Sequence, residues 1–451
     1  MTGICAIFSH GKDAEDRVGT ILDCMKVRGQ VARKVQTKVD DAGYLVIAEC
    51  NHAEEGFALS GNRLLPLVLD GALFDDSSGV ALETEIGDPD GLFRFPGSFA
   101  FLGQTEQGLV AGRDPLGQKP LYWGRDENGD YAFASLKFAL ERVGIRDPRP
   151  VGPGEIVYVT IQGESVSTNH LLSKPSPRET SEKQALEELE KLLFEAVRKM
   201  VPKKAAIAFS GGLDSALVAV ACKKAGLDPE LVTVGLHGQP ELEHASLVAR
   251  SIELHHTLRP LTAEEIVEAL PRVIHTIESD NPVTVGISVP FYFVCEQARE
   301  IGERYIVAGQ LSDELFGGYA RFESIAREKG LAEADLALWK SVLAASAGDF
   351  EPGDKLAVAS RLELRCPFAY LPLVKYSLQI PTELKIEIST VRAVRKYILR
   401  RLAEKWELPA SVVNRPKSAF QYSSGVQKVL KKEARRNKME VGRFLKSLHS
   451  S

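Results

Sequence analysis

The chain has 451 residues, of which 44% are hydrophobic and 26% charged, and its 61 acidic and 56 basic side chains give a net charge of −5. This length predicts two or three domains, and the charge gives no reason to expect nucleic acid or a membrane surface as partner. No run of about 18 apolar residues occurs, and the N-terminus lacks a signal-peptide pattern. Six scattered cysteines without C-x-x-C spacing exclude a disulfide framework and a clustered zinc site, and they predict a reducing cytoplasm. Together these exclusions predict a cytoplasmic enzyme.

Short apolar segments, rich in β-branched and aromatic residues, occupy the first 166 residues. Gly, Asp and Asn separate them, which is typical of strands joined by turns, and one helix is expected over 13–28. The expected strands are CAIFSH at 5–10, YLVIAE at 44–49, LLPLVLDG at 64–71, GSFAFLG at 97–103, GLVAG at 108–112, LYWGR at 121–125, YAFAS at 131–135 and EIVYVTI at 155–161. Residues 167–182 are rich in Ser, Thr and Pro and predict a linker.

Strands alternate with helices in residues 183–451. An amphipathic helix is predicted over 182–200, where leucines recur at helical spacing. The later strands AAIAF, LVTVGL and RYIVAG are separated by helical patterns, which predicts a parallel sheet with helical crossovers. The last third is mostly helical. The segment beyond residue 427 contains eight Lys or Arg and only two Glu. This excess of positive charge indicates either a solvated helix or a surface for an anionic ligand or RNA.

One segment combines a strand, a glycine turn and a helix start. AAIAF runs into SGGLDS at 210–215 and then into an apolar helix. The two glycines allow a tight turn, and the helix start adds unpaired N–H donors and a positive dipole, so the segment can bind a phosphate chain. Asp214 beside phosphates implies a bridging Mg²⁺. The alternative is a plain N-cap by Asp214 or Ser215. A Walker A sequence is absent, so simple γ-phosphate hydrolysis is not indicated.

A second strand-to-loop segment, RYIVAGQLSDELFGGY at 304–319, carries an acidic pair followed by glycines. A carboxylate at the carboxyl end of a parallel strand lies where such sheets bind ligands. Asp313 is therefore predicted as a second Mg²⁺ ligand. The alternative is that Asp313 and Glu314 are only a charge pair at a helix N-terminus.

The hexapeptide SGGLDS resembles the pyrophosphate loop of the N-type ATP pyrophosphatases, which cleave ATP between the α and β phosphates. DELFGGY at this distance resembles the glutamine-dependent asparagine synthetase B family. Further segments match that family in order, namely GRDPLGQKPLY at 112–122, LELRCPF at 362–368, KYILR at 396–400 and RPKSAF at 415–420.

The resemblance spans nearly the whole chain and implies its fold class. Residues 1–166 are expected to form an α+β sandwich of the N-terminal nucleophile type, similar to class II glutamine amidotransferases. Residues 183–451 are expected to form an α/β parallel-sheet domain of the adenine nucleotide α-hydrolase type, similar to N-type ATP pyrophosphatases. Residues 167–182 would link the two.

The resemblance also implies roles for single residues of the ligase site. Glu278 would accept the proton of the attacking ammonia, and Lys417 would neutralise the β-phosphate and the developing oxyanion. Asp214 and Asp313 would bind Mg²⁺. ATP and pyrophosphate would contact Ser210, Gly211, Gly212, Leu213, Asp214, Ser215, Val234 and Gly309. Two departures from the family, Leu311 for glycine and Tyr370 for aspartate, concern the acceptor pocket.

The N-terminal segment departs from the family more strongly, because a glutaminase of this class uses an N-terminal cysteine as nucleophile. Ungapped matching places Thr2 there, and removal of Met1 would make it N-terminal. A threonine hydroxyl ionises less readily than a thiol. A rival alignment uses Cys5, which would need cleavage after Ile4, so Cys5 is expected to be a buried strand cysteine.

The predicted glutamine pocket, Asp70, Gly71 and Glu83, is also altered. Asp70 stands in place of an asparagine that donates to the oxyanion, and an ionised carboxylate cannot donate. Ala72 removes a carboxylate that helps hold glutamine, and Glu83 replaces an aspartate that pairs with its amino group. Together with the change at Thr2, these substitutions predict that glutamine hydrolysis is weak, altered or lost.

These features predict an ATP- and Mg²⁺-dependent amide ligase of the asparagine synthetase type. It would adenylate the side-chain carboxylate of aspartate, release pyrophosphate and let ammonia displace AMP. One alternative is a divergent ligase, like the β-lactam synthetases, that acts on another carboxylate. Another is a non-catalytic nucleotide-binding relative. The expected partners are small molecules (ATP, aspartate or a related carboxylate, ammonia or glutamine), and the sequence leaves a monomer or a homodimer open.

Overall fold

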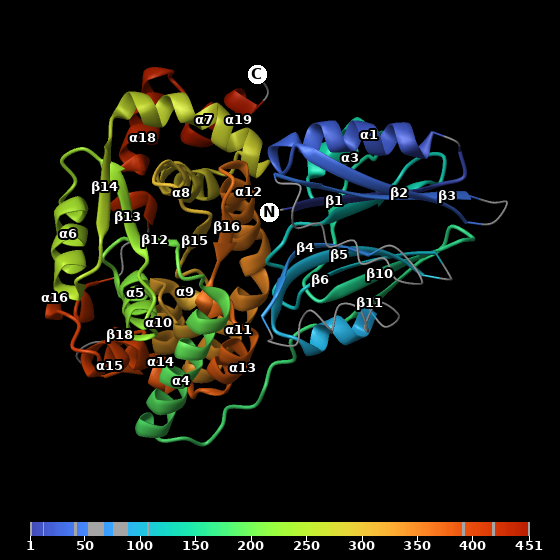
Figure 1. The fold of residues 1–451 in the computed structure, drawn as a ribbon. Helices are drawn as coiled ribbons and strands as arrows, with labels where there is room; N and C mark the ends of the chain where they lie inside the picture. The colour runs from blue at the N-terminus through green and yellow to red at the C-terminus, as the bar shows by residue number, and fades with distance from the viewer. Residues whose placement is uncertain are drawn as a thin grey trace. The chain divides into compact units, whose positions relative to one another are not determined.

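The computed structural model describes residues 2–11, 13–39, 43–52, 67–74, 89–105, 108–389, 393–416 and 420–449 (Figure 1). The chain divides into two compact units, Met1–Ser173 (unit 1) and Lys174–Ser451 (unit 2). This division falls within the segment 167–182. Strand β11, Ser165–Asn169, takes up the first three residues of that segment.

Unit 1 contains two antiparallel sheets. Its described strands have the order β2-β3-β1-β8-β7-β9 in one sheet and β11-β10-β6-β5-β4 in the other. Their bounds are β1 Thr2–Ser9, β2 Val31–Val39, β3 Gly43–Asn51, β4 Leu67–Leu73, β5 Gly97–Thr105, β6 Gly108–Arg113, β7 Tyr122–Arg125, β8 Tyr131–Ala134, β9 Arg149–Pro150, β10 Glu155–Thr160 and β11 Ser165–Asn169. Register is fixed along β1, where Thr2 lies opposite Asn51 of β3.

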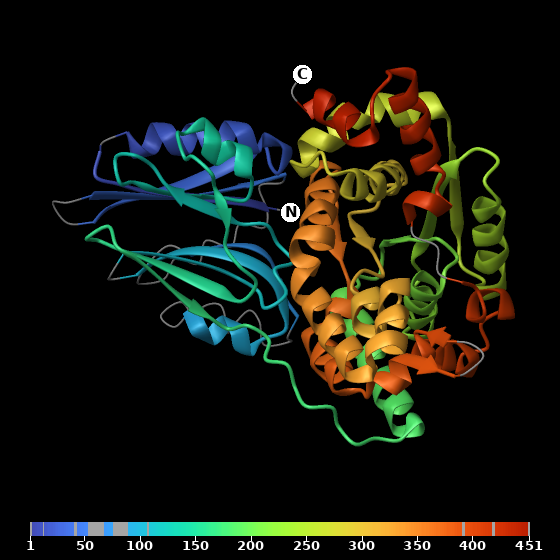
Figure 2. The ribbon, with the colours of Figure 1, turned by 180° about the vertical axis from the view of Figure 1, so that it is seen from behind.

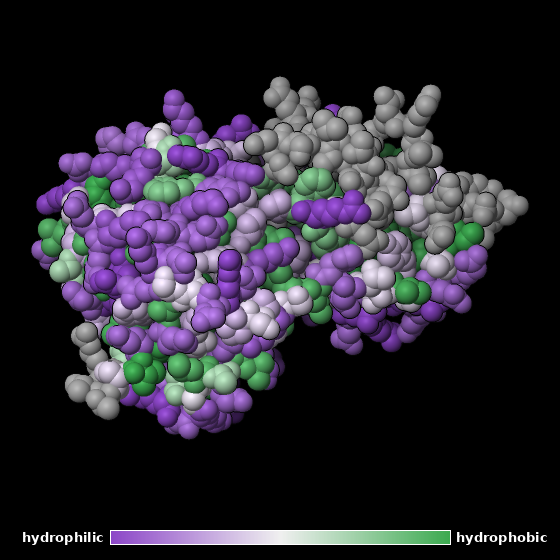
Figure 3. Space-filling model, turned by 90° about the horizontal axis from the view of Figure 1, so that it is seen from below, coloured by the Kyte–Doolittle hydropathy of each residue, from purple (hydrophilic) through white to green (hydrophobic). Residues whose placement is uncertain are grey.

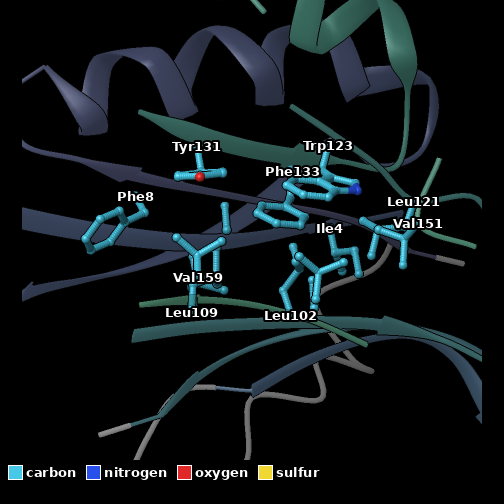
Figure 4. Packing of buried hydrophobic residues seen from close by; sticks show 14 of the residues in the cluster. Ile4, Phe8, Leu102, Leu109, Leu121, Trp123, Tyr131, Phe133, Val151 and Val159 are labelled. Atoms are coloured by element: carbon cyan, nitrogen blue, oxygen red, sulfur yellow. The ribbon is translucent and has the colours of Figure 1, made fainter. Parts of the chain in front are cut away.

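The core of unit 1 lies between the two sheets (Figure 4). Ile4 and Phe133 of one sheet face Leu102 of the other, and the rings of Trp123 and Phe133 stack with centroids 5.5 Å apart. Each fully buried side chain of this size contributes about 1.5–3 kcal/mol relative to an exposed one. This apolar layer holds both sheets in one sandwich.

Helices cover the outer faces of this sandwich. The first sheet carries α1, Ala14–Cys24, and α3, Lys137–Arg142, whose apolar side chains join those of β1 and β3 in a second cluster. The short helices η1, Met25–Val27, and η2, Pro89–Arg94, complete the described helices of unit 1. Leu92 of η2 packs on the second sheet.

Strands form at all eight segments where the sequence predicts them. The helix expected over 13–28 is α1 followed by η1. The strands β2, β9 and β11 were not predicted. In β2 and β11, Lys, Arg, Gln, Ser and Thr outnumber the valines, so these strands lack the apolar runs that marked the others.

Unit 2 is built on a five-stranded sheet of order β14-β13-β12-β15-β16, in which every neighbouring pair is parallel. The bounds are β12 Ala206–Ala208, β13 Glu230–Leu236, β14 His256–Leu261, β15 Tyr305–Val307 and β16 Glu363–Arg365, and β17 Ile386–Ile388 pairs with β18 Ala393–Arg395 in a separate hairpin. The predicted parallel sheet with helical crossovers is confirmed.

Helices cover both faces of this sheet, with α5 on one face and α8 on the other (Figure 1), and the view from behind shows the same layering (Figure 2). The strand order accounts for this arrangement. The chain moves outward from β12 to β14 and then returns to β15, so crossovers of one hand place helices on opposite faces. The described helices are α4 Glu182–Met200, α5 Leu213–Lys224, α6 Pro240–Ile252, α7 Ala263–Ile277, α8 Pro282–Glu300, α9 Ser312–Phe316, α10 Ala320–Lys329, α11 Leu331–Ala345, the π-helix η3 Ser346–Phe350, α12 Glu351–Ala359, η4 Pro367–Ala369, α13 Leu371–Gln379, α14 Thr382–Lys385, α15 Tyr397–Lys405, α16 Ala410–Val413, α17 Phe420–Ser423, α18 Val426–Arg436 and α19 Val441–His449.

The predicted helix over 182–200 is confirmed as α4. It begins at a capping box, in which the Ser181 hydroxyl accepts from the Gln184 N–H at 3.3 Å and the Gln184 side chain accepts from the Ser181 N–H at 3.1 Å. Its leucine stripe is buried.

No helix of the described residues is long and apolar enough to cross a membrane. On the face seen in Figure 3, hydrophobic residues are interspersed among hydrophilic ones. The eight basic side chains beyond residue 427 are exposed, as expected for solvated helices. They belong to α18 and α19 or follow directly after α18 in the chain.

Candidate functional site

The predicted phosphate loop joins β12 to α5. β12 pairs with β13 on one side and β15 on the other, so this loop leaves the sheet where the strand order reverses. Open α/β sheets bind ligands at such a point, beyond the carboxyl ends of the strands. The Ser210 hydroxyl accepts from the Gly212 N–H at 3.2 Å, and the Ser215 hydroxyl donates to the Gly212 carbonyl at 3.2 Å. The two serines thus hold the turn closed.

Glycine is required at position 211. Its φ of +65° lies in the left-handed region, and a Cβ there would approach Cα of Ala245 to 2.9 Å. The ring Nε2 of His244 lies 3.0 Å from the Gly211 carbonyl, and burial lowers the pKa of His244. Helix α6 therefore packs directly on the phosphate loop and supports its conformation.

The second predicted loop, between β15 and α9, lies beside the first. A Cβ on Gly309 would be 3.0 Å from Cβ of Asp214, so the two loops can approach this closely only because residue 309 is glycine. The Ser312 hydroxyl donates to Oδ1 of Asp214 at 2.8 Å. The structure thus brings Asp214 and the Asp313 segment together at the carboxyl edge of neighbouring strands.

Lys396 joins the two aspartates. Its Nζ lies 2.6 Å from both carboxylate oxygens of Asp214, 2.7 Å from Oδ1 of Asp313 and 3.2 Å from the Ser312 hydroxyl. The lysine is 3% exposed and has a left-handed backbone conformation, with a φ of +56°. Because two partly buried carboxylates would otherwise repel each other, this ammonium stabilises their arrangement.

Sequence reasoning did not assign a role to Lys396. It begins the segment KYILR, which matched the family, but no local pattern places it beside Asp214, 182 residues earlier in the chain. The sequence offered one signal for this role. A segment that matched the family contained a lysine without an assigned role, in a chain with two predicted metal ligands.

The donor set at this site suits Mg²⁺. Two carboxylates that already touch one cation can reach another small cation, and Mg²⁺ in nucleotide sites is held by one or two carboxylates together with phosphate oxygens. Among the described residues no group of three or more His, Cys, Asp or Glu is arranged to hold a metal by itself. Asp214 and Asp313 therefore fit a metal that arrives with phosphate.

A cavity of about 680 Å³ opens at these loops. It is lined by Ser210, Asp214 and Ser215 of the first loop, by Gly309 and Asp313 of the second, and by residues of α8, α11 and α12. This volume lies within the range of ligand sites. Five of the predicted nucleotide and metal residues therefore share one concave surface.

Glu314 also lines the cavity and accepts a hydrogen bond from the Tyr319 hydroxyl at 2.6 Å. Burial, together with the nearby carboxylates of Asp349 and Asp313, raises the pKa of Glu314 to about 7. The same surroundings raise the pKa of Tyr319, mainly through burial. The hydroxyl is therefore protonated at neutral pH and donates to Glu314.

Glu278, the predicted ammonia base, lies elsewhere. It ends α7 in a left-handed conformation and accepts from Lys355 Nζ at 2.6 Å, with both side chains less than 10% exposed. It is not among the described residues that line the cavity. An ion pair of this kind favours a structural role, and the role as base stays a prediction.

Three further predicted positions differ in their placement. Val234 is buried within β13 and is not among the described residues of the cavity wall. Leu311 lines the cavity, whereas Tyr370 is buried away from it and donates to Glu195 at 2.6 Å. Lys417 lies outside the described residues, so the structure does not test it.

In unit 1, Asp70 stands at the predicted oxyanion position and forms an ion pair. Arg28 Nη2 lies 2.7 Å from Oδ2 of Asp70, and Arg28 Nε donates to the Thr2 carbonyl at 3.0 Å. Arg28 is 1% exposed and Asp70 fully buried. Asp70 thus accepts from an arginine at the site where the predicted family places a donor.

The other predicted residues of unit 1 have mixed outcomes. Thr2 is 5% exposed at the start of β1, and Gly71 is half-buried in β4. Cys5 is a fully buried strand cysteine, as predicted, and burial raises the pKa of its thiol. Glu83 lies outside the described residues.

Comparisons with known proteins identify relatives of both units. The family model described as asparagine synthase matches residues 188–346 and 326–441, and that of a glutamine amidotransferase domain matches 79–149. The chain is 30% identical over 402 residues to putative glutamine-hydrolyzing asparagine synthetase 1 of Methanocaldococcus jannaschii, covering 78% of this chain and 73% of that protein. It is 29% identical over 360 residues to the glutamine-hydrolyzing asparagine synthetase B of Escherichia coli, covering 76% and 62%.

The matches to solved structures have low TM-scores and low sequence identities. The allosteric regulatory enzyme of purine biosynthesis has a TM-score of 0.32 at 17% identity, over 52% of this chain and 66% of that one. The NMN synthetase of Francisella tularensis has a TM-score of 0.31 at 11% identity, over 60% and 94%. The predicted fold classes are instead confirmed by the family matches and by the sheet topologies.

Replacement of Lys396 tests its hold on the two aspartates. Lys396→Met leaves two carboxylates without their shared cation, and we expect a loss of about 3 kcal/mol in the free energy of unfolding. In EDTA the thermal midpoint should fall below that of the wild type, and millimolar Mg²⁺ should recover part of the loss by binding the folded state. Lys191→Met, at an exposed pair with Glu188, is the control. An unchanged midpoint in EDTA would contradict this role.

A second pair of variants separates a structural Glu278 from a catalytic one. Glu278→Gln removes the carboxylate charge that lies 2.6 Å from the buried Lys355 Nζ, so the free energy of unfolding should fall by about 3–5 kcal/mol. Glu278→Gln combined with Lys355→Met should recover stability and, with it, ligase activity. If the double variant is stable but inactive with ammonia, Glu278 acts in the chemistry and the structural assignment is wrong.

Proposed function

Because this chain belongs to the asparagine synthase family, we propose that it is an ATP-dependent carbon–nitrogen ligase that adenylates a carboxylate and converts it to an amide. The observation that carries the proposal is the meeting of the Ser210–Ser215 loop, Asp214, Asp313 and Lys396 at the point where the sheet reverses its order.

In the proposed reaction, a carboxylate oxygen of the acceptor attacks the α-phosphorus of ATP, and the bond to the bridging oxygen of the β-phosphate breaks. Pyrophosphate leaves, and the acyl adenylate remains. Ammonia then attacks the acyl carbon, loses a proton to a base, and the C–O bond to AMP breaks.

We assign a partner in unit 2 to each phosphate charge that develops in this reaction. The N–H groups at the start of α5 and the serine hydroxyls of the loop would hold pyrophosphate. Bound Mg²⁺ would neutralise phosphate charge, held by Asp214 and Asp313. We assign Lys417 to the β-phosphate and the oxyanion by its place in the RPKSAF segment. In the adjoining chain the Arg415 carbonyl accepts from Arg400, and Phe420 lines the cavity.

Aspartate is the first candidate acceptor, because the curated relatives are named asparagine synthetases. The chain spans 73% of the M. jannaschii relative but less than two thirds of the E. coli one. A different carboxylate, as in ligases of the β-lactam synthetase type, is the second candidate. Leu311 supports it, because a leucine with a φ of +74° lines the cavity where the family carries glycine.

We propose that the nitrogen comes mainly from free ammonia. Asp70 is engaged by Arg28 and, as a carboxylate, cannot donate to an oxyanion. A hydroxyl at Thr2 would be a weaker nucleophile than a thiol. Unit 1 would then have a structural role.

The six cysteines are all free thiols, which agrees with a reducing compartment.

The proposal is tested by incubating the protein with ATP, Mg²⁺ and aspartate and measuring AMP, pyrophosphate and asparagine by mass spectrometry. We expect all three products with ammonia, and less than about a hundredth of that rate with glutamine. Glutamate release should be equally low in Thr2→Ala. Asp313→Asn, which removes one metal ligand, should abolish product formation.

The outcomes separate the parts of the proposal. Without AMP or pyrophosphate from aspartate with either nitrogen donor, the asparagine version fails. If no carboxylic acid supports exchange of pyrophosphate into ATP, the protein is a non-catalytic relative. Glutamate release at the rate of amide formation would contradict the loss of glutaminase, and its persistence in Thr2→Ala would exclude Thr2 as nucleophile.

A further inference from the structure

Carbonyl groups in and directly before the phosphate loop of unit 2 are bound by donors of the protein. The Phe209 carbonyl accepts from the Thr233 hydroxyl at 2.6 Å, and this hydroxyl in turn accepts from Nε2 of His256 at 2.8 Å. The Gly212 carbonyl accepts from the Ser215 hydroxyl at 3.2 Å. A carbonyl oxygen that faced a phosphate would repel it, so the orientation of each of these peptide groups affects anion binding.

The carbonyl of Gly211 is held by a side chain from outside the loop. His244 lies in α6, and its Nε2 is 3.0 Å from the Gly211 carbonyl oxygen. Because a carbonyl oxygen can only accept, Nε2 carries the proton and donates it. The imidazole lies close against the loop, since a Cβ on residue 211 would come within 3.0 Å of Cδ2 of His244. His244 is not among the described residues that line the cavity, so the carbonyl points to a side chain outside that wall.

The other end of the same peptide group is on the cavity side. In a trans peptide, the C=O of Gly211 and the N–H of Gly212 point in opposite directions. The Gly212 N–H donates to the Ser210 hydroxyl at 3.2 Å, and Ser210 lines the cavity. Rotation of this peptide by half a turn would break both hydrogen bonds and turn the carbonyl oxygen toward Ser210. The partial negative charge of that oxygen would then oppose a phosphate in the loop.

Two neighbouring glycines offer little resistance to this rotation. The φ of Gly212 is −80°, and half a turn of the peptide would bring it to a positive value. Glycine adopts positive φ about as readily as negative φ, whereas other residues rarely do. The glycines that permit the tight turn therefore also permit the reversed peptide, and hydrogen bonds must select between the two orientations.

We propose that His244 is a positioning residue that holds the Gly211–Gly212 peptide with its carbonyl away from the phosphates, so that the loop can bind the pyrophosphate part of ATP. This inference rests on the proposed function only in that ATP binds at this loop, and it does not depend on which acid is adenylated. Burial lowers the pKa of His244, and the neutral ring still donates through Nε2. The hydrogen bond therefore needs no charge on the imidazole.

The test measures the affinity of the full chain for ATP, pyrophosphate and AMP by calorimetry in the presence of Mg²⁺. His244→Leu removes the donor and should weaken the binding of ATP and of pyrophosphate about tenfold. The affinity for AMP should stay unchanged, because AMP lacks the phosphates that the loop is proposed to hold. His275→Leu, at an exposed position in the last turn of α7, is the matched control and should leave all three affinities unchanged.

Two amide variants test the position of the donor. The side chain of His244→Gln can place its amide nitrogen near the position of Nε2, so its affinity for pyrophosphate should be closer to that of the wild type than to that of His244→Leu. The side chain of His244→Asn is shorter and reaches only the position of Nδ1. It should therefore bind pyrophosphate as weakly as His244→Leu does.

Gly212→Ala tests the rotation of the peptide. Alanine tolerates the observed φ of residue 212 but disfavours the positive φ of the reversed peptide. In the Gly212→Ala background, His244→Leu should therefore weaken pyrophosphate binding by only about threefold or less. The ratio of affinities is taken within each background, so a direct effect of the added methyl group on the ligand cancels.

Four results would overturn the inference alone. These are equal losses of affinity for pyrophosphate and AMP in His244→Leu, a loss no larger than that in His275→Leu, no tighter binding by His244→Gln than by His244→Leu, and an effect of His244→Leu that is equal in both backgrounds. If the wild type binds ATP and pyrophosphate but no acid supports pyrophosphate exchange, the proposed function fails and this inference is decided by the binding data. If the wild type binds neither ligand, both fail.

Discussion

The ammonium group of Lys396 holds together the two carboxylates on which the nucleotide site depends. Asp214 lies in the first turn of α5, and Asp313 lies in the first turn of α9. These helices follow two neighbouring parallel strands of one sheet. Two carboxylates at such an edge repel each other unless a cation lies between them. With Lys396 in place, the loops approach so closely that a Cβ on Gly309 would lie 3.0 Å from Cβ of Asp214. The phosphate loop is therefore preorganised for a ligand that brings its own metal.

Unit 1 also contains a buried cation, but this cation engages a carboxylate instead of preparing carboxylates for a ligand. Arg28 satisfies Asp70 inside the sandwich, at the position where the family uses a neutral donor. Lys396 offsets the repulsion between two partly buried carboxylates, and Arg28 offsets the cost of burying one carboxylate completely. In unit 2 the carboxylates still face a cavity, whereas in unit 1 the carboxylate is fully buried and engaged. The physical contrast explains why we assign chemistry to unit 2 and a structural role to unit 1.

The parts of the fold that sequence reasoning predicted are those with local signals. The SGGLDS turn, the leucine stripe of α4 and the apolar strands each carry their information within a dozen residues. β2 was missed because its alternating charged residues hide its pairing with β3. Lys396 was missed as a site residue because its partners lie 182 and 83 residues away, and only the fold brings them together.

Transfer of oxygen from the acceptor to AMP tests the central claim most directly. The acid that supports the fastest pyrophosphate exchange is labelled with ¹⁸O in its carboxylates, and AMP formed with ammonia is analysed by mass spectrometry. Attack of the carboxylate on the α-phosphorus must leave one labelled oxygen in each AMP. AMP without that label, or label in pyrophosphate or orthophosphate, would contradict an adenylating ligase at this site.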